Sequence, residues 1–254
     1  MAREQHVALV TGGARRIGRA IAEDLAANGF AVAIHYNDAR EEAERLVAAI
    51  ETQGGRAALV EADLTDMDAA AGIVARAAGA LGPVRLLVNN ASAFEDDAAD
   101  DFDWQVWDRH FALHVKAPAL LARQMAAALP REQDGLVVNI IDQRVWRLTP
   151  KFFSYTLSKS ALWTATRTMA QTYAPRLRIN AIGPGPTLAN ERQQARDFAR
   201  QVDGLLLRRG PELGEFGATI RYLWQARSVT GQMIALDGGQ HLSWQTPDIY
   251  GIAE

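Results

Sequence analysis

Three side chains in the middle of the chain have the types and the spacing that proton transfer requires. Tyr155 and Lys159 stand four residues apart in YTLSK (155–159), and Asp142 precedes the tyrosine by thirteen residues. In a helix, residues at i and i+4 share one face. An ammonium group there would lower the pKa of the phenol and make it a usable general acid, whereas a carboxylate would oppose this effect. We therefore expect Tyr155 and Asp142 to share a proton beside Lys159.

A tyrosine–lysine pair at this spacing is common by chance, so its meaning depends on the elements around it. TGGARRIG (11–18) follows a strand-like run and opens a helical pattern. Its glycines allow a tight turn, and a helix N-terminus offers free N–H groups to a phosphate. We expect a dinucleotide phosphate to bind here, at Gly12, Arg15, Arg16, Ile17 and Gly18. In the alternative interpretation the glycines form a simple turn without a ligand.

The elements that would position these groups alternate along the chain. Apolar, β-branched runs occur at 6–11, 31–36, 57–62, 85–91, 135–141, 177–182 and 232–236, and helical patterns lie near 16–28, 39–53, 66–80, 104–129, 153–173 and 212–226. Strands that alternate with helices of this length form parallel sheets with right-handed crossovers. We expect one α/β domain over 1–254, a Rossmann-like fold with a doubly wound sheet of seven parallel strands in the order 3-2-1-4-5-6-7.

Composition excludes several classes of protein. The chain has 254 residues, a net charge of −3, 22% charged residues and no cysteine. Disulfides and thiolate zinc sites are therefore excluded, and nothing indicates a nucleic-acid or membrane-surface partner. We find no signal peptide and no apolar run as long as a membrane span, so we expect a cytoplasmic protein. HFALH (110–114) has the spacing of a zinc site but lacks the glutamate after the first histidine, and we expect no metal.

The end of the second strand predicts which dinucleotide binds. Sites for NAD usually carry an acidic residue there, which binds the ribose 2′-hydroxyl, whereas sites for NADP omit the acid and offer a cation. In HYNDAR (35–40) Tyr36 stands at the acidic position, and Arg15, Arg16 and Arg40 are further cations of this region. Asp38 opposes this reasoning, since an inward carboxylate would repel a 2′-phosphate. We expect NADPH, with contacts at this end from His35, Tyr36, Asn37 and Arg40.

Five motifs stand in the order and spacing of one family: TGGARRIG, NNAS (89–92), YTLSK, INAIGPGPT (179–187) and LDGG (236–239). In these motifs the chain resembles the short-chain dehydrogenase/reductase family along nearly its whole length. The resemblance implies hydride transfer with NAD(P)H and a homotetramer in which the helices near 104–129 and 153–173 pair across a twofold axis. It also implies further cofactor contacts from Asp63, Leu64, Asn89, Ala91, Ser92, Lys159, Pro184, Gly185 and Thr187.

Departures from the usual family pattern narrow the expectation. Asp142 replaces the usual serine, Arg16 replaces the middle glycine of the loop, and Ser92 replaces the glycine of NNAG, with Phe94 close behind. Each departure resembles the pteridine reductase branch, which includes bacterial dihydromonapterin and dihydrofolate reductases. The resemblance implies that Phe94 stacks on the substrate ring and that Arg16, Ser92, Asp142 and Tyr155 contact the substrate.

We therefore expect an NADPH-dependent reductase that transfers hydride to a ring C=N of a pterin or dihydrofolate-like substrate, with Tyr155 and Asp142 supplying the proton. A carboxylate suits this chemistry because the substrate's N–H groups need an acceptor. Two alternatives remain: a carbonyl reductase acting on a 3-oxoacyl thioester or a small ketone, and a cofactor-binding scaffold without turnover. Residues 188–210 are predicted to form a substrate lid or, alternatively, a surface helix. His114 is predicted to take part in a proton relay or to be a buried structural histidine.

Overall fold

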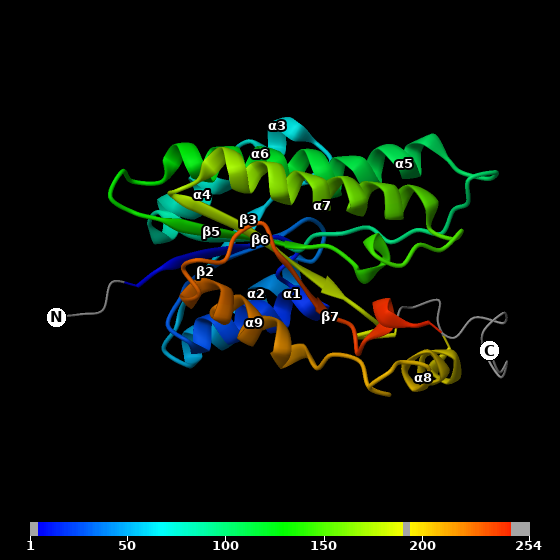
Figure 1. Cartoon of the computed structure of the whole chain (residues 1–254). Helices are drawn as coiled ribbons and strands as arrows, with labels where there is room; N and C mark the ends of the chain where they lie inside the picture. Colours follow the sequence, from blue (N-terminus) through cyan, green and yellow to red (C-terminus); the bar gives the residue numbers. More distant parts are fainter. Residues whose placement is uncertain (1–4, 190–193, 245–254) are drawn as a thin grey trace, which may run out of the picture.

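The computed structural model describes residues 5–189 and 194–244, and in this part of the chain seven apolar segments form one parallel sheet (Figure 1). The strands are β1 (Val7–Val10), β2 (Ala31–Tyr36), β3 (Arg56–Glu61), β4 (Val84–Asn89), β5 (Gly135–Ile140), β6 (Leu177–Pro184) and β7 (Met233–Leu236). Their order in the sheet is β3-β2-β1-β4-β5-β6-β7. The doubly wound parallel sheet predicted from the sequence is thus confirmed, including its strand order.

Helices cover both faces of the sheet. On one face lie α1 (Arg16–Ala27), α2 (Arg40–Thr52) and α9 (Leu213–Gln225), and on the other lie α4 (Ile73–Leu81), α6 (Ala117–Ala128) and α7 (Phe153–Tyr173) (Figure 1). Successive strand residues point to opposite sides, so Ala8 and Val10 of β1 pack into the first layer and Val7 and Leu9 into the second. Burial on both faces explains why the strands are continuous apolar runs in the sequence.

The helical pattern near 104–129 contains a π turn. It consists of α5 (Trp104–Phe111), the π segment η1 (Ala112–Lys116) and α6, which follow one another without a break. The Asp103 side chain caps α5 by accepting hydrogen bonds from the second and third backbone N–H groups after it. π turns are rare and often occur at functional sites. This one places His114 within hydrogen-bonding distance of Ser158 on α7.

Other boundaries differ from the expected ones in small ways. The pattern near 66–80 divides into α3 (Met67–Ala70) and α4. Two short elements lie outside the sequence prediction, the 3₁₀ turns η2 (Gln143–Val145) and η3 (Gln240–Leu242). Helix α8 (Ala195–Asp203) fits the surface helix that was the alternative for residues 188–210. α8 falls within the segment predicted as a lid, and none of its residues is buried. The lid stays a prediction, since residues 190–193 lie outside the described part of the chain.

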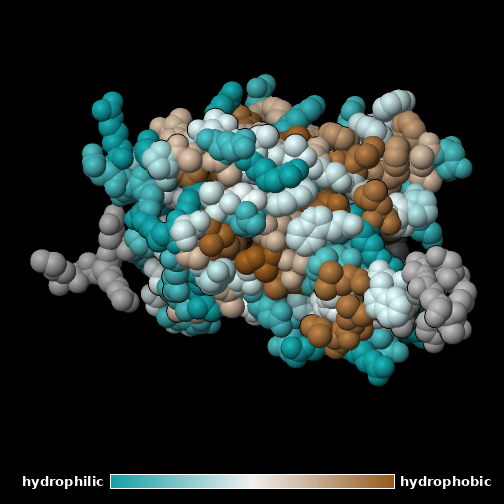
Figure 2. All heavy atoms as spheres, viewed as in Figure 1, coloured by the Kyte–Doolittle hydropathy of each residue, from teal (hydrophilic) through white to brown (hydrophobic). Residues whose placement is uncertain are grey.

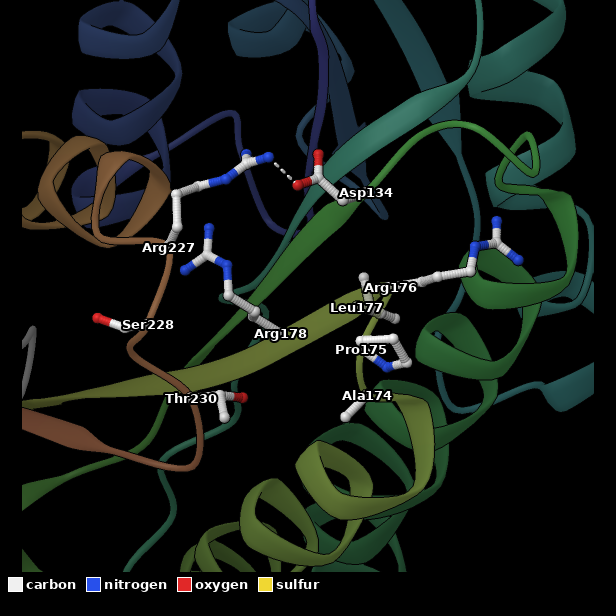
Figure 3. Close-up of a pocket in the computed structure, with 9 residues that line it drawn as sticks. All are labelled: Asp134, Ala174, Pro175, Arg176, Leu177, Arg178, Arg227, Ser228 and Thr230. Atoms are coloured by element: carbon white, nitrogen blue, oxygen red, sulfur yellow. Dashed lines mark ion pairs between the residues drawn. The ribbon is translucent and has the colours of Figure 1, made fainter.

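A small cavity of about 250 Å³ lies at the end of the sheet where β5 and β6 begin. It is lined by Asp134, Ala174, Pro175, Arg176, Leu177, Arg178, Arg227, Ser228 and Thr230. Figure 3 shows Arg178 and Arg227 beside each other, with Arg227 paired to Asp134, whereas Arg176 points away from them. Arg178 donates to several carbonyl oxygens at the end of α9 and in the loop after it. Arg178 and Arg227 therefore fasten the end of α9 and the loop after it to the sheet.

Within residues 5–189 and 194–244, no helix combines the length and the apolar character that crossing a membrane requires.

Candidate active site

The carboxyl ends of the strands open into a cavity of about 1070 Å³. The loops after β1 to β6 contribute to its wall, together with residues of α7 and α8. Ligands of open α/β sheets bind at this edge, where the strand order reverses. The volume lies at the upper end of the range for small-molecule sites, so the cavity is large enough for a cofactor and a second molecule.

Two glycines shape the loop after β1. Gly12 has a φ of +59°, which favours glycine, and a Cβ on Gly18 would lie 2.1 Å from the Gly12 carbonyl oxygen. The Gly12 N–H donates to Nδ1 of His35 (3.1 Å), and Nε2 of the same ring contacts the carbonyl oxygen of Ala62 (3.1 Å). Burial lowers the pKa of His35 from 6.5 to about 4. The ring is therefore neutral with its proton on Nε2, and it fastens the glycine loop to β2.

Arg16 occupies the position of the usual middle glycine and adopts the left-handed conformation that glycine favours, with a φ of +52°. Its guanidinium reaches the segment after β6, where Nη1 donates to the carbonyl oxygen of Ala189 (3.1 Å) and Nη2 to that of Leu188 (3.3 Å). Arg16 thus joins the glycine loop to the start of the predicted lid, across the cavity that both segments line.

The end of β2 differs in one respect from the expectation. Arg15 lines the cavity and pairs with Glu42 (2.8 Å). Arg40 was expected to contact the cofactor, but it lies outside the cavity lining because its guanidinium pairs with Glu61 on the neighbouring strand β3. The Tyr36 hydroxyl donates to the same carboxylate (3.0 Å). A partner that is distant in sequence therefore holds the Arg40 side chain away from the cavity lining, and a cofactor contact from Arg40 stays a prediction.

The NNAS segment contributes its second asparagine to the cavity, not its first. Asn89 is buried in the sheet, where its Nδ2 donates to Oδ1 of Asn139 on β5 (2.8 Å). Asn90 lines the cavity and donates to the carbonyl oxygens of Thr11 (2.9 Å) and Gly12 (3.1 Å). The structure thus places Asn90 at the cavity and Asn89 within the sheet, since successive side chains at a strand end point to opposite sides, and the cofactor contact from Asn89 stays a prediction.

Asp142, Tyr155 and Lys159 meet where β5 ends against α7. The Tyr155 hydroxyl donates to Oδ2 of Asp142 (3.1 Å), and the Lys159 ammonium donates to the carbonyl oxygen of Ile140 (2.9 Å). Lys159 Nζ lies 5.6 Å from the centre of the Tyr155 ring. All three side chains are buried and line the cavity. The structure brings these three residues together as expected, while their chemical roles stay predictions.

The pKa of the Tyr155 phenol shifts in the direction opposite to the one expected from Lys159. Burial, followed by the Asp142 carboxylate, raises the pKa of Tyr155 well above 10, whereas the Arg144 guanidinium acts in the opposite direction. Burial lowers the pKa of Lys159 from 10.5 to about 8, which Asp142 partly opposes. Lys159 was expected to bring the phenol's pKa nearer neutral, but desolvation and the carboxylate outweigh it. At neutral pH the phenol is therefore protonated and the ammonium is charged.

A model of the short chain dehydrogenase family matches residues 6–200. The chain belongs to this family. Among solved structures, FolM alternative dihydrofolate reductase 1 from Brucella suis, in complex with NADP, is similar to the chain with 61% identity and a TM-score of 0.95, covering 98% of this chain and 100% of that one.

Two curated relatives extend the comparison. An uncharacterized oxidoreductase of Methylorubrum extorquens is 32% identical over 93% of this chain and 98% of its own length. The 3-oxoacyl-[acyl-carrier-protein] reductase FabG of Staphylococcus epidermidis is 27% identical over 92% of this chain and 98% of its own. The family and the dihydrofolate reductase-like branch inferred from the motifs are thus confirmed, and the chain is a short-chain oxidoreductase.

Behind the tyrosine of this short chain dehydrogenase runs a series of hydrogen bonds. Ser158 Oγ donates to the carbonyl oxygen of Tyr155 (2.7 Å), so it accepts a bond from Nδ1–H of His114 (2.8 Å). Nε2 of His114 is then the acceptor for Ser92 Oγ at 2.9 Å. Burial is the main cause that lowers the pKa of His114 well below 6.5, so the ring is neutral. The buried, structural interpretation of His114 fits these contacts, and its part in a proton relay stays a prediction.

Aromatic rings form the part of the cavity wall beside Tyr155. Phe94 and Phe152 stack with their centres 4.3 Å apart at an interplanar angle of 18°, and Phe94 meets Tyr155 edge to face at 4.8 Å. Phe152 has a φ of +58°, a strained conformation for a bulky residue. The Arg144 guanidinium carbon lies 5.3 Å from the Phe94 ring centre and 5.1 Å from that of Phe152. Phe152 therefore supports Phe94, the residue expected to stack on the substrate.

Most residues expected at the site line the cavity. They are Gly12, Arg15, Arg16, Ile17, Gly18, His35, Tyr36, Asn37, Asp63, Leu64, Ala91, Ser92, Phe94, Asp142, Tyr155, Lys159, Pro184, Gly185 and Thr187. Lining residues that sequence reasoning missed include Asn90, Arg109, Arg144, Phe152, Phe198 and Gln240. Only Arg144 carried a usable signal among these, since an arginine two residues after a turn-forming aspartate can pair with it.

Proposed function

We propose that this short-chain oxidoreductase uses NADPH to reduce a ring C=N of a pterin or dihydrofolate-like substrate. The observation that carries the proposal is the Asp142 carboxylate, which stands where the family usually has a serine and accepts a hydrogen bond from the Tyr155 hydroxyl. The 61% identity to the Brucella suis dihydrofolate reductase, over nearly the full length of both chains, supports the same class of substrate.

The residues present fit a nicotinamide dinucleotide. No side chain caps the N-terminus of α1, so its first N–H groups are free to bind a phosphate beside the Gly12–Gly18 contact. Among the described residues, the buried Lys159 ammonium has one hydrogen-bond acceptor, the carbonyl oxygen of Ile140. An ammonium has three N–H donors, so Lys159 retains donors for ribose hydroxyls.

The end of β2 favours NADPH over NADH. Tyr36 stands in place of the acid that binds a ribose 2′-hydroxyl, and Arg15 lies at the same side of the cavity. The Asp38 side chain is 82% exposed and lies 3.9 Å from the Arg15 guanidinium. A 2′-phosphate would compete with Asp38 for this cation, and Asp38 is exposed enough to turn toward solvent.

When bound, NADPH supplies the hydride. Tyr155 supplies the proton, because its phenol stays protonated and the residue lines the cavity. Within the described residues, Oδ1 of Asp142 accepts only the backbone N–H of Arg144, so one of its lone pairs remains for an N–H donor of the substrate. The Lys159 ammonium stabilises the phenolate that forms when Tyr155 gives up its proton.

Carbonyl reduction is the second candidate, favoured by the similarity to the FabG reductase of Staphylococcus epidermidis. A carbonyl oxygen gains negative charge as it is reduced, and catalysis requires hydrogen-bond donors aimed at that oxygen. The Asp142 carboxylate would repel this charge, whereas a serine hydroxyl would donate to it. An aspartate at position 142 therefore favours a substrate that offers hydrogen-bond donors, such as the amino and ring N–H groups of a pterin.

We further propose a homotetramer located in the cytoplasm. The two helices expected to pair expose apolar side chains, with Trp104 of α5 65% exposed and Leu157 of α7 38% exposed. Hydrophobic atoms also gather at the end of the molecule near α8 and η3 (Figure 2). Leu207 there is 64% exposed and Leu242 59% exposed.

One assay separates the candidates. NADPH oxidation is followed with dihydrobiopterin, dihydrofolate and an acetoacetyl thioester, and each reaction is repeated with NADH. We expect turnover with at least one of the two pteridine substrates, little with the thioester, and a higher kcat/KM with NADPH. Turnover of the thioester alone would establish the carbonyl reductase, and no oxidation with any substrate would favour the non-catalytic scaffold.

A further inference from the structure

An arginine that the family motifs do not contain holds the acid of the site. Arg144 lies in η2, two residues after Asp142, and contacts both carboxylate oxygens: its backbone N–H donates to Oδ1 (2.8 Å) and its Nη1 to Oδ2 (3.0 Å). The side chains are 19% and 12% exposed, so the ion pair is largely removed from water. Two bonds to different oxygens fix the rotation of the carboxylate as well as its place.

This fixed orientation determines which oxygen faces the phenol. Oδ2 receives both the Arg144 guanidinium and the Tyr155 hydroxyl (3.1 Å). With three donors around it, the Asp142 side chain acts as a hydrogen-bond acceptor. Without the guanidinium, Oδ2 of Asp142 would retain only the Tyr155 hydroxyl as a donor, so the carboxylate would be held less firmly in its orientation against the phenol.

The charge of Arg144 matters most after proton transfer. When Tyr155 gives its proton to the substrate, a phenolate lies beside the Asp142 carboxylate, and two buried like charges repel each other strongly. Lys159 is one counter-charge on the helix of Tyr155, and Arg144 is a second one on the side of Asp142. Arg144 is also the positive group that opposes the raised pKa of the phenol.

The Arg144 guanidinium also contacts the stacked rings of Phe94 and Phe152. Its carbon lies just over 5 Å from the ring centres of both Phe94 and Phe152, which is within the range of cation–π attraction. Arg144 therefore contacts both Asp142 and Phe94, the residue on which the substrate ring is expected to stack. A planar guanidinium can do both at once, whereas a lysine ammonium provides only a point charge.

We propose that Arg144 is a positioning residue for the reduction: it fixes the Asp142 carboxylate against Tyr155 and offsets the negative charge that develops when the phenol gives up its proton. The chemical consequence rests on the proposed function of the site, while the coupling of Arg144 to Tyr155 through Asp142 does not depend on which substrate is reduced.

The first test is a double-mutant cycle on pteridine reduction. Arg144→Met removes the charge and keeps an apolar stem of similar length, and we expect kcat to fall about 100-fold, the effect of removing one preorganised charge-stabilising group. NADPH affinity, measured by its fluorescence, should stay within a factor of two, and Arg144→Lys should restore part of the activity. Arg147→Met is the matched control, because Arg147 is exposed on the same loop and lies outside the cavity lining.

The cycle is completed in an Asp142→Asn background. If Arg144 acts through Asp142, Arg144→Met should cause little further loss there, since residues that work as one unit are non-additive. A loss of about 100-fold again in this background, or a kcat of Arg144→Met above half of the wild-type value, would overturn the proposal.

The second test needs no substrate, so it separates a failure of this proposal from a failure of the proposed function. 3-Fluorotyrosine is placed at position 155, where fluorine lowers the phenol's pKa, and its titration is followed by ¹⁹F NMR toward high pH. The charged or titratable groups around this ring are Asp142, Arg144, His110, His114 and Lys159. Arg144→Met should move the titration midpoint to higher pH, and Arg147→Met should leave it in place. Equal midpoints in wild type and Arg144→Met would refute the electrostatic coupling.

Discussion

The buried ring of His35 predicts that the fold loses stability in mild acid. Its Nδ1 accepts the Gly12 N–H and its Nε2–H donates to the Ala62 carbonyl oxygen, an arrangement that requires the neutral ring. Protonation would turn the acceptor into a donor that faces another donor. Burial accordingly lowers the pKa from 6.5 to about 4.

The sign and size of the loss of stability follow from the difference between the pKa values of His35 in the unfolded and the folded chain. Between pH 6.5 and 4 the unfolded chain binds a proton at His35 that the folded chain does not bind, so unfolding becomes easier as the pH falls. The stability that the neutral ring contributes is present above pH 6.5 and lost as the pH falls through about 4. It amounts to roughly 3 kcal/mol, with a slope of about 1.4 kcal/mol per pH unit.

The assay is urea unfolding of the cofactor-free protein at several pH values between 4 and 7.5, on wild type and on His35→Asn. Asparagine keeps an acceptor for the Gly12 N–H but does not titrate. At pH 7 it should cost about 1–2 kcal/mol, because the bond to Ala62 is lost. His110 and His114, whose pKa values burial also lowers, act in the same direction in both proteins.

The wild-type curve should therefore fall more steeply than the His35→Asn curve, and the two curves should cross at about pH 5 to 6, where wild type has lost about 1–2 kcal/mol. Parallel curves over the whole range would refute the reasoning, since they would mean that His35 has the same pKa in the folded and unfolded chains.

Three further predictions concern catalysis and assembly. Tyr155→Phe should lower kcat by about 10²–10⁴-fold, the usual contribution of a general acid, with unchanged NADPH binding by fluorescence titration; retention of a tenth of the activity would place the acid elsewhere. Lys159 loses its charge near pH 8, so kcat/KM for pteridine reduction should fall above that pH, and a profile that stays flat to about pH 9.5 would contradict this. Light scattering at micromolar concentration should show a tetramer, and Trp104→Glu should shift it to smaller species; a wild-type monomer would exclude the proposed assembly.

The sheet and the cofactor loop could be predicted from the sequence because their causes are local. The strand β5 and the helix α7 are both clear in the pattern, and a parallel sheet brings the end of one beside the start of the other, so the meeting of Asp142 and Tyr155 followed. Gly12 and Gly18 indicated the cofactor loop for a similar reason. The positive φ of Gly12 and the close contact of Gly18 with the Gly12 carbonyl oxygen both disfavour any residue with a Cβ.

The sequence could not place a side chain whose direction depends on a partner that is distant along the chain. Arg40 is close to Tyr36 along the chain, but Glu61 on the adjacent strand attracts its guanidinium out of the cavity. Asn89 and Asn90 could be separated only by knowing where β4 ends, and one residue of difference reverses the direction of a side chain. Phe152 reaches the site through a left-handed backbone conformation that no local pattern predicts for phenylalanine.

The π turn at Ala112–Lys116 determines how this region can be aligned and altered. Each residue of an α-helix rotates the side-chain direction by about 100° around the helix axis. The extra residue of a π turn therefore rotates the side chains of α6 relative to those of α5. In this arrangement Leu121 and Met125 of α6 are buried, while Trp104 of α5 is exposed. Deleting one residue here would restore a regular helix but rotate one half against the other, and it would separate His114 from Ser158. Relatives with a straight helix should therefore need a one-residue gap in this segment, and designs that shorten it should fail even though every remaining side chain is unchanged.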